Sequence, residues 1–299
     1  MSHILISAEE LDELMAADPT VRLLDVRWRL DRPDGRPEFL DGHIPGAVYV
    51  SLDDELAEHG APTEGRHPLP STARLQAAAR RWGLNDGETV VVYDDLKSLS
   101  AARAWWLLTN AGVADVRILD GSLRAWTDAG RPLETGDVVP VPGTVTLSRG
   151  RLSKLSIDEA ADLAATGILI DVRAAERYRG DVEPIDPRAG HVPGALNRFT
   201  GANVDAAGRF LDPDTLRGEF AELGVVDGAP VGVYCGSGVT ASHAYVALTI
   251  AGYSPVLYAG SWSQWSNHPD RPVATGPHPE GELASTQTDQ PAQSEKELS

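Results

Sequence analysis

Cys235 is the only cysteine in the chain, and the residues around it are of types that support covalent chemistry. An apolar run at 231–234 predicts a buried strand that ends at this residue. Gly236 and Gly238 then permit a tight turn, and a helical pattern follows as far as about residue 251. A strand, a glycine loop and a helix N-terminus direct backbone N–H groups towards one point, where they stabilise a thiolate. The segment predicts a reactive nucleophile, although a lone cysteine is more commonly a small buried side chain.

The composition limits the classes of protein to which the chain can belong. Its 299 residues, of which 42% are apolar, predict two domains with modest cores. A single cysteine excludes an internal disulfide and a cysteine-rich metal site, and a lone reactive thiol is typical of a reducing compartment. The N-terminal segment does not resemble a signal peptide, and no run approaches the about 20 apolar residues of a membrane span. We therefore expect a cytoplasmic protein that needs no metal and no cofactor.

The formal net charge of −18 argues against nucleic acid and against an anionic membrane surface as partners. It does not exclude a small anionic substrate, because a local cluster of basic side chains reverses the sign of the potential. Such a substrate requires arginine or lysine wherever it binds.

An internal repeat runs through most of the chain, with matching segments about 140 to 150 residues apart. Each half contains a capping-box pattern, an Asp-Val-Arg segment, a Gly-His-x-Pro-Gly-Ala segment and a Gly-Ser-x-x-x-Trp segment. They begin at Ser7, Asp25, Gly42 and Gly121 in the first half, and at Ser156, Asp171, Gly190 and Gly260 in the second. These ordered matches indicate a duplicated domain whose length differences fall in loops.

Within each half, short apolar runs alternate with helical patterns. This order predicts an α/β fold of two tandem domains, each a parallel sheet flanked by helices, with site residues at the carboxyl ends of strands. We expect the first domain to span 1–136, a linker 137–152 and the second domain 153–276. Residues 277–299 are rich in Glu, Gln, Ser, Thr and Pro, and they predict a disordered tail.

The two halves differ at the loop that carries the cysteine. Asp94 occupies the position of Cys235, and the glycines that follow the cysteine are missing there. We therefore expect only the second domain to be catalytic, with the first as a scaffold and one wall of the cleft. Residues that recur in both halves predict structure rather than catalysis: Asp25 and Asp171, Arg27 and Arg173, and His43 and His191.

Together, the repeated segments and the cysteine loop resemble the rhodanese family. The tandem form, with Asp94 in the first loop and Cys235 in the second, is similar to the two-domain sulfurtransferases that use thiosulfate or 3-mercaptopyruvate. The resemblance covers about residues 5–275 and implies two domains with parallel five-stranded sheets and an active site between them. It also implies the reaction, in which the Cys235 thiolate takes a sulfane sulfur from the donor, forms a persulfide and passes the sulfur to an acceptor.

The resemblance leaves the donor open. Overall the chain is similar to actinobacterial thiosulfate sulfurtransferases, whereas the loop Cys-Gly-Ser-Gly-Val-Thr resembles that of mercaptopyruvate sulfurtransferases. This loop has no basic residue that would suit the thiosulfate dianion. The implied partners are a small anionic sulfur donor and, as the acceptor, cyanide, a small thiol or a thioredoxin-like protein.

The resemblance also implies which residues surround the persulfide. Ser237 matches a loop serine proposed to assist proton movement, and Arg177 matches an arginine that binds the charged group of the donor. His67 and Arg188 are weaker candidates, as a partner of the serine and as a second anion-binding arginine. The backbone amides that would stabilise the sulfur anion are those of Gly236, Gly238, Val239 and Thr240.

The acidic partner expected beside His67 is not evident in the sequence. Ser51 falls where an aspartate is expected, and Asp53 lies two residues further on. A proton relay through His67 is therefore no better supported than a surface-loop histidine.

Two other functions remain alternatives. A cysteine-dependent phosphatase needs a guanidinium at the end of the loop, and residues 240–243 are Thr, Ala, Ser and His. A non-catalytic rhodanese-like module that binds or regulates is the second alternative, since the first half already contains a loop without the nucleophile. A sulfur adduct on Cys235 would separate the sulfurtransferase from both.

Overall fold

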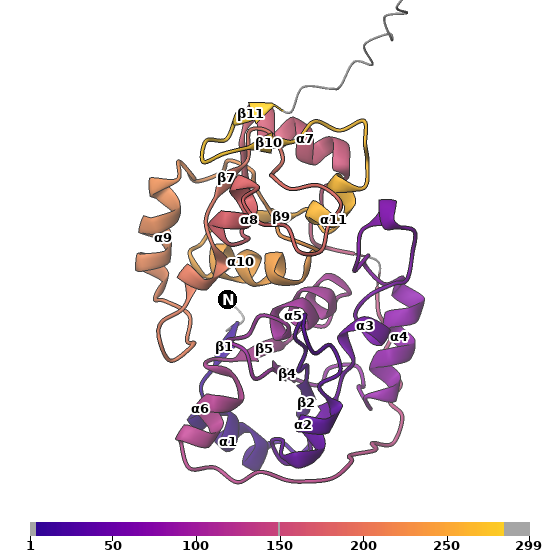
Figure 1. Ribbon diagram of the computed structural model, residues 1–299. Coiled ribbons are helices and arrows are strands. Elements are labelled where there is room, and N and C mark those ends of the chain that lie inside the picture. Colours follow the sequence, from indigo (N-terminus) through magenta and orange to yellow (C-terminus); the bar gives the residue numbers. More distant parts are fainter. Residues whose placement is uncertain (1–3, 149, 284–299) are drawn as a thin grey trace, which may run out of the picture.

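The computed structural model describes residues 4–148 and 150–283 and contains two α/β domains (Figure 1). The first domain has a parallel sheet with the strand order β1-β5-β4-β2-β3. Its strands are β1 (Leu5–Ile6), β2 (Arg22–Asp25), β3 (Val48–Tyr49), β4 (Val90–Tyr93) and β5 (Val116–Leu119). Its helices are α1 (Ala8–Ala17), α2 (Arg36–Asp41), α3 (Leu52–Glu55), the 3-10 turn η1 (Pro62–Glu64), α4 (Thr72–Arg81), α5 (Ala101–Asn110) and α6 (Ser122–Asp128).

The second domain repeats this plan with a parallel sheet of order β7-β6-β8-β9. Its strands are β6 (Ile168–Asp171), β7 (Leu196–Asn197), β8 (Val231–Tyr234) and β9 (Pro255–Leu257). Its helices are α7 (Ile157–Thr166), α8 (Ala175–Arg179), the 3-10 turn η2 (Thr200–Asn203), α9 (Pro213–Glu222), α10 (Val239–Ile250) and α11 (Ser261–Ser266). The predicted fold, two tandem parallel sheets flanked by helices, is confirmed.

The second sheet departs from the five strands that the family resemblance implies. In the described part of the chain it has four strands, and a single parallel bridge between Lys154 and Leu257 takes the place of a fifth beside β9. A separate antiparallel pair is formed by β10 (Ala274–Thr275) and β11 (Glu282–Leu283).

Both predicted capping boxes are present. Ser7 accepts a hydrogen bond from the N–H of Glu10, whose carboxylate accepts one from Ser7 in return. Ser156 and Glu159 make the same pair of bonds at the start of α7. Each domain thus begins its first long helix with two N–H groups satisfied by side chains.

The central strands β4 and β8 are buried along their whole length, as expected for parallel strands covered on both faces. Asp94 follows β4 directly, and Cys235 follows β8. Each of these two residues therefore lies at the carboxyl edge of its sheet.

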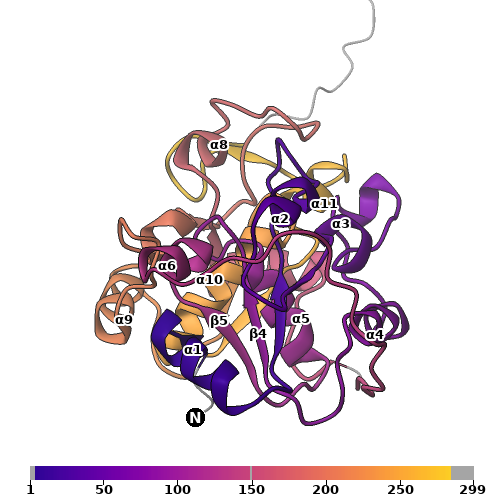
Figure 2. The ribbon, with the colours of Figure 1, turned by 90° about the horizontal axis from the view of Figure 1, so that it is seen from below.

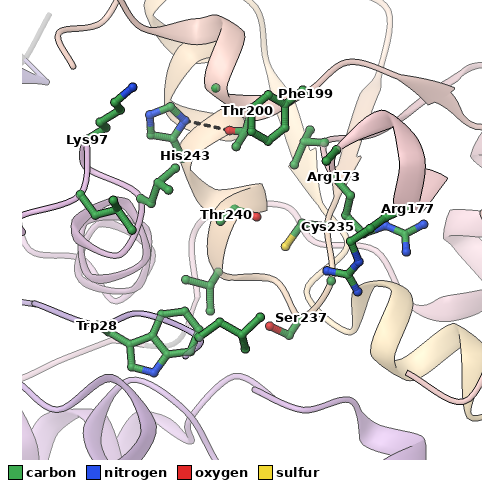
Figure 3. A pocket seen from close by; sticks show the side chains of 18 of the residues that line it. Trp28, Lys97, Arg173, Arg177, Phe199, Thr200, Cys235, Ser237, Thr240 and His243 are labelled. Carbon is green, nitrogen blue, oxygen red and sulfur yellow. Dashed lines mark hydrogen bonds between the residues drawn. The ribbon is translucent and has the colours of Figure 1, made fainter. Parts of the chain in front are cut away.

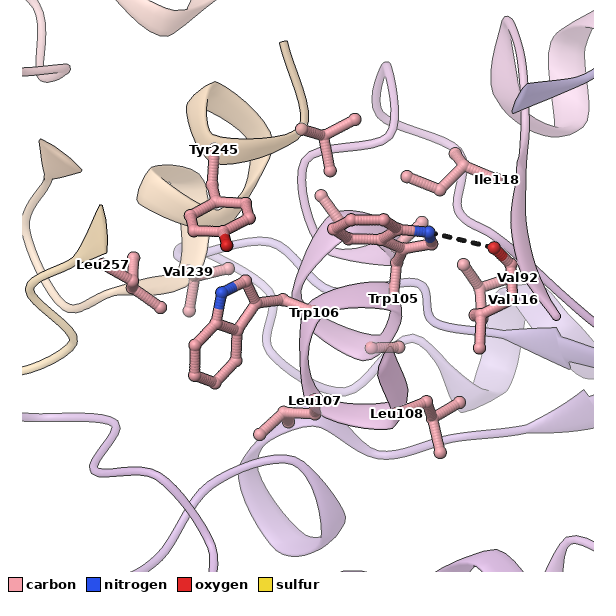
Figure 4. Packing of buried hydrophobic residues seen from close by; sticks show 14 of the residues in the cluster. Val92, Trp105, Trp106, Leu107, Leu108, Val116, Ile118, Val239, Tyr245 and Leu257 are labelled. Carbon is pink, nitrogen blue, oxygen red and sulfur yellow. Dashed lines mark hydrogen bonds between the residues drawn. The ribbon is translucent and has the colours of Figure 1, made fainter. Parts of the chain in front are cut away.

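The domains meet through α5 and α10, the helices that follow the two loops (Figures 1 and 2). Trp105 and Trp106 of α5 pack against Tyr245 of α10, with ring centroids 6.5 and 6.2 Å apart (Figure 4). The Trp105 indole N–H donates to the Val116 carbonyl at 2.9 Å. One apolar cluster extends across both helices, so this interface is part of the core and holds the loops of the two domains near one another.

The linker predicted at 137–152 lies against the first domain. The N–H of Gly143 donates to the Arg80 carbonyl at 2.7 Å, and Val145 and Leu147 are buried in the core. None of the helices in the part of the chain described here has the length and apolar character required to cross a membrane.

Residues 277–283, the part of the predicted disordered tail that the structure describes, are ordered, so the prediction is wrong for them. Residues 282–283 form β11, and the carbonyl of Pro279 accepts a hydrogen bond from Gly194 at 2.8 Å. These seven residues are therefore packed onto the second domain through backbone pairing, which their polar composition does not reveal. The rest of the predicted tail, 284–299, lies outside the described residues.

Candidate active site

A cavity of about 490 Å³ lies between the domains at the carboxyl end of β8 (Figure 3). The second domain supplies the cysteine loop, with Arg173, Arg177, Phe199 and Thr200. The first domain supplies a second wall, formed by Trp28, Leu30, Arg66, Leu96, Lys97 and Leu99. Figure 3 shows the sulfur of Cys235 facing the interior, with Arg177 and Ser237 beside it.

Cys235 is 2% exposed, and its backbone N–H donates to Ser261 Oγ at 3.1 Å. Its Sγ atom accepts a hydrogen bond from the N–H of Gly238 at 3.1 Å. Gly238 begins α10 with a φ of 81°, and a Cβ there would lie 2.4 Å from the Ala259 carbonyl oxygen, so only glycine fits. The sulfur therefore sits at the N-terminus of a buried helix, which favours a negative charge.

The other loop residues named by the sequence also line the cavity. Val239 and Thr240 form the first turn of α10, where backbone N–H groups have no partner within the helix. Gly236 lies next to the sulfur, and its carbonyl accepts a hydrogen bond from Ser263 at 2.8 Å. Three of the four predicted amide residues, Gly236, Val239 and Thr240, thus line the cavity with Cys235, and the fourth, Gly238, bonds to the sulfur itself.

Ser237 and His67 are joined across the domain boundary. Ser237 Oγ lies 2.7 Å from His67 Nδ1, and His67 Nε2 lies 3.2 Å from Asp53 Oδ1. Burial lowers the pKa of His67, although the Asp53 carboxylate acts in the opposite direction. We assign a neutral ring that donates from Nε2 to Asp53 and accepts the Ser237 hydroxyl proton at Nδ1.

Asp53 is the acidic partner that the sequence did not place. Ser51 instead caps α3 by accepting a hydrogen bond from the Asp54 N–H. One helical turn then directs Asp53 towards His67, and the Trp28 indole N–H donates to the same carboxylate oxygen at 3.0 Å. Asp53 thus takes the role expected at residue 51, two positions earlier, because its place in α3 brings the carboxylate to His67.

Arg177 lies where the sequence predicted, beside the cysteine loop. Its Nη2 atom is 2.7 Å from Glu183 Oε1 and 3.3 Å from Asp186 Oδ2. A Cβ placed on Gly236 would lie 3.4 Å from Arg177 Nη1. The guanidinium is therefore held by buried carboxylates while one edge faces the backbone next to the sulfur.

Arg188 lies elsewhere, and its predicted place in the anion site is corrected. Its guanidinium donates to four backbone carbonyls at the end of α11 and beyond it: those of Trp265, Ser266, His268 and Arg271. An arginine in this position completes a helix C-terminus. It is not among the residues that line the cavity.

The residues that recur in both halves have the predicted structural contacts. Arg27 and Arg173 each pair with the aspartate two positions earlier, with N–O distances of 2.7 Å in both domains. Each also donates at 2.6 Å to a carbonyl next to the recurring histidine, and each histidine stacks on an aromatic ring. The same bonds occur with and without the cysteine, so they belong to the scaffold.

Arg66 and Arg103 lie at the site, although the sequence did not single them out. Arg103 on α5 is fully buried, and its guanidinium donates to the carbonyls of His67 at 3.0 Å and Gly238 at 3.4 Å. Burial lowers the pKa of Arg103 to about 10, while its electrostatic interaction with Cys235 acts in the opposite direction. Two features of the sequence could have indicated these residues: Arg103 is a charged residue within the apolar run 101–108, and Arg66 lies next to His67.

Known proteins relate the chain to one family. A model of the rhodanese-like domain matches residues 7–129 and 156–268. The chain belongs to the rhodanese family. This rhodanese-family chain is 34% identical over 281 residues to the 3-mercaptopyruvate sulfurtransferase of Escherichia coli, over 89% of the chain and 94% of that protein. It is 49% identical over 279 residues to a Mycobacterium tuberculosis protein provisionally named thiosulfate sulfurtransferase SseB, over 92% of the chain and 98% of that protein.

The fold agrees with a solved structure of the same family. The crystal structure of SseA from Escherichia coli, described as a 3-mercaptopyruvate sulfotransferase with the rhodanese fold, superposes with a TM-score of 0.77. The two sequences are 33% identical, and the match covers 87% of this chain and 99% of SseA. Among residues 4–148 and 150–283, no group of three or more His, Cys, Asp or Glu side chains is arranged to hold a metal ion.

Proposed function

We propose that this rhodanese-family protein is a sulfurtransferase that moves a sulfane sulfur from thiosulfate or 3-mercaptopyruvate to a thiophilic acceptor. The observation that carries the proposal is the position of Cys235. Its sulfur accepts a hydrogen bond at the N-terminus of α10 and faces a cavity that also contains Arg177. A nucleophile, an anion-stabilising helix end and a cation for the donor thus share one space.

In the first half-reaction the Cys235 thiolate attacks the outer sulfur of the donor and forms an S–S bond. With thiosulfate, the donor's own S–S bond breaks, and sulfite leaves with the electron pair. With 3-mercaptopyruvate, the C–S bond breaks, and the donor's thiol proton ends on the methyl carbon of pyruvate. In the second half-reaction the acceptor bonds to the outer sulfur, and the Cys235 thiolate leaves.

Backbone N–H groups stabilise the two anions of this reaction, the Cys235 thiolate and the persulfide. The Gly238 N–H already bonds to the sulfur, and we assign the N–H groups of Gly236, Val239 and Thr240 to the outer sulfur of the persulfide. Oriented N–H groups of this kind act without reorganising when the charge moves.

The arrangement of Ser237, His67 and Asp53 suits the reaction of 3-mercaptopyruvate better than that of thiosulfate. Only 3-mercaptopyruvate requires a proton to move from sulfur to carbon. A hydroxyl bonded to a neutral histidine offers a path for that proton, and Asp53 holds the ring in the required orientation. We therefore assign Ser237 and His67 to proton transfer with 3-mercaptopyruvate.

The acceptor completes the proposal. Cyanide, a small thiol or a thioredoxin-like protein can supply the second nucleophile, because the chain has no other cysteine to resolve the persulfide. A lone reactive thiol is stable in a reducing compartment, so we place the protein in the cytoplasm. We propose a first domain at 1–136, a linker at 137–152 and a second domain that begins at 153 and extends beyond the expected limit of 276 to include residues 277–283.

The two alternatives are less well supported. The guanidinium groups at the cavity come from Arg66, Arg173 and Arg177, and the cysteine loop and first turn of α10 contain none. A phosphatase would need one there to follow the transferring group. A purely binding module does not require a buried thiol that accepts a hydrogen bond at a helix N-terminus.

The decisive experiment is to incubate the protein with each donor and measure its intact mass. We expect one added sulfur atom, and we expect no adduct in the Cys235→Ala variant. Thiocyanate formation from cyanide then gives the rate with thiosulfate and with 3-mercaptopyruvate. An unmodified wild-type mass after both donors would show that the protein is not a sulfurtransferase of this type.

A further inference from the structure

We propose that Arg66 of the first domain is a specificity-determining residue that raises the reactivity towards a dianionic sulfur donor, thiosulfate, relative to that towards 3-mercaptopyruvate. The proposal rests on the function proposed above, because it concerns the donor that reacts with Cys235. It resolves a conflict in the sequence, where the cysteine loop itself contains no basic residue for a dianion.

The loop that carries Arg66 is fixed to the second domain. Gly65 has a φ of 92°, and a Cβ there would lie 2.9 Å from the carbonyl oxygen of Gly260, so the two backbones are in close contact. The Arg66 N–H donates to Ser263 Oγ at 3.0 Å. The next residue, His67, is hydrogen-bonded to the cysteine loop. The residues before and after Arg66 therefore both contact the second domain, and these contacts fix its backbone there.

Arg66 and Arg177 approach the same point of the cysteine loop. A Cβ placed on Gly236 would lie 3.4 Å from Arg66 Nη2 and 3.4 Å from Arg177 Nη1. Both arginines line the cavity that Cys235 faces. The absence of a side chain at residue 236 therefore leaves a space that is bordered by two guanidinium groups next to the sulfur.

One buried carboxylate positions both arginines. Asp186 accepts from Arg66 Nη1 at 2.8 Å and from Arg177 Nη2 at 3.3 Å, and its side chain is 3% exposed. The Nε atoms of both arginines are buried and, within residues 4–148 and 150–283, have no hydrogen-bond partner. The two groups are thus oriented by the protein and retain N–H donors for a ligand that carries several oxygens.

The charges of this cluster distinguish the two donors. Arg66 and Arg177 balance Asp186 and Glu183, and Arg173, which also contacts Glu183, is balanced by its own partner Asp171, so the cluster as a whole is neutral. Without Arg66, the cluster would carry one net negative charge, and its repulsion would be twice as large for a dianion as for a monoanion. Thiosulfate carries two charges on a group with three oxygens, whereas the single carboxylate of 3-mercaptopyruvate is satisfied by Arg177 alone.

A purely structural role for Arg66 makes a different prediction. The pair with Asp186 joins the two domains, so Arg66 also contributes to how they pack around the cavity. If that were its only role, its loss would affect both donors equally, through the shape of the cavity. Donor selectivity is therefore the quantity to measure.

The experiment compares kcat/KM for thiosulfate and for 3-mercaptopyruvate, with cyanide as the acceptor, in the wild type, Arg66→Gln and Arg66→Lys. Arg124→Gln is the matched control, because Arg124 is an exposed residue of α6 whose ion-pair partner among residues 4–148 and 150–283 is Asp128, and its loss changes the net charge equally. We expect Arg66→Gln to lower kcat/KM for thiosulfate about tenfold or more and for 3-mercaptopyruvate less than about threefold. Arg66→Lys keeps the charge and should lose less of the ratio.

Equal changes with both donors, or an unchanged ratio in a folded Arg66→Gln variant, would overturn the proposal and leave the sulfurtransferase function intact. Thermal unfolding establishes that the variant is folded. If Arg66→Gln does not fold, an unchanged donor ratio in Arg66→Lys, which lacks the planar guanidinium, overturns it instead. Failure of the wild type to form a persulfide with either donor would overturn the proposed function, and the donor selectivity with it.

Discussion

The loops after β4 and β8 have the same place in the fold but differ in how they bind a negatively charged group. In the first loop the Asp94 carboxylate accepts from backbone N–H groups at 2.8 to 3.1 Å, those of Leu96, Ser98, Ser100 and Ala101. The Ser122 hydroxyl donates to the same carboxylate at 2.8 Å. In the second loop the Cys235 sulfur accepts one N–H, that of Gly238, and faces a cavity. In the first loop the N–H groups are occupied by the protein's own carboxylate, whereas the second loop borders a cavity that can hold an anionic substrate.

The two loops also obtain their shape differently. Lys97 and Ser98 have positive φ values of 57° and 64°, a conformation that is costly for residues with a side chain. The bonds to Asp94 stabilise that conformation. The second loop uses Gly238 at a φ of 81°, which involves no such cost and so does not depend on a buried carboxylate. The catalysis that we propose for the second copy and the stability of the first therefore follow from different residues on one scaffold.

Cys235→Asp gives the second loop the chemistry of the first, and it should have the largest effect. A carboxylate cannot hold a sulfane sulfur, so we expect no adduct by mass spectrometry and turnover lowered at least about 10³-fold with either donor. Cys235→Ser is the isosteric control for the shape of the loop. Residual sulfur transfer in both variants would place the chemistry on another residue.

Asp94→Ala tests whether the first loop depends on its internal anion. The change leaves several buried N–H groups without an acceptor, so we expect a loss of about 3 to 5 kcal/mol in the free energy of unfolding, measured with urea. The neighbouring Asp95 pairs with Arg29 near the surface, and Asp95→Ala should cost less than about 1 kcal/mol. Similar losses in the two variants would contradict the comparison.

Ser237→Ala tests a feature that only the second loop has. Removal of the hydroxyl that bonds to His67 should lower kcat with 3-mercaptopyruvate about 10²-fold, because the proton path is lost. The rate with thiosulfate should change little, since sulfite leaves without taking a proton from the donor. His67→Gln should reproduce this split, and an equal loss with both donors would remove the proton-transfer role.

The smallest expected effect concerns His243, which stands on α10 where the repeat has Ala102 on α5. Its Nδ1 lies 2.9 Å from Thr200 Oγ1, and its ring stacks on Phe210. Burial, with a smaller effect of Arg198, lowers the pKa of His243 to about 3. The folded state therefore keeps the ring neutral, whereas the unfolded chain binds a proton below about pH 6.5.

Because the unfolded chain binds the extra proton, the free energy of unfolding decreases as the pH falls from about 6.5 towards 3. At about pH 4.5 we expect this loss to be about 2 to 3 kcal/mol. Urea unfolding at both pH 7 and about pH 4.5 measures the loss, and His243→Gln should remove that part of it. The same pH dependence in the variant and in the wild type would show that other groups cause the acid sensitivity.

The sequence predicted what depends on local order along the chain. The repeat, the alternation of apolar runs and helical patterns, and the capping residues are local patterns, and they predicted both sheets and both capping boxes. Cys235 and its glycines were evident because a nucleophile needs a tight turn before a helix, which the four consecutive residues 235–238 encode. The recurring pairs Asp25–Arg27 and Asp171–Arg173 were correctly assigned to the scaffold, since function does not require two copies.

The sequence was less informative where a side chain bonds to a distant segment. Arg188 was expected at the anion site, but its guanidinium completes the end of α11, about 80 residues further along the chain. The order of residues 277–283 comes from backbone pairing with β10 and with Gly194, which composition does not encode. Both errors concern contacts between segments that only the folded chain brings together.

By itself, the sequence determined the fold, the duplicated plan and the residue that we propose as the nucleophile, because periodicity and turn residues act over a few neighbouring positions. Only the tertiary structure decided which residues of the first domain complete the site. Arg66 and Arg103 approach the cysteine loop, and Asp53 is linked to it through His67, because the apolar faces of α5 and α10 pack together and bury the boundary between the domains. That packing is non-directional and is set by the whole interface, so no local pattern in the chain specifies it.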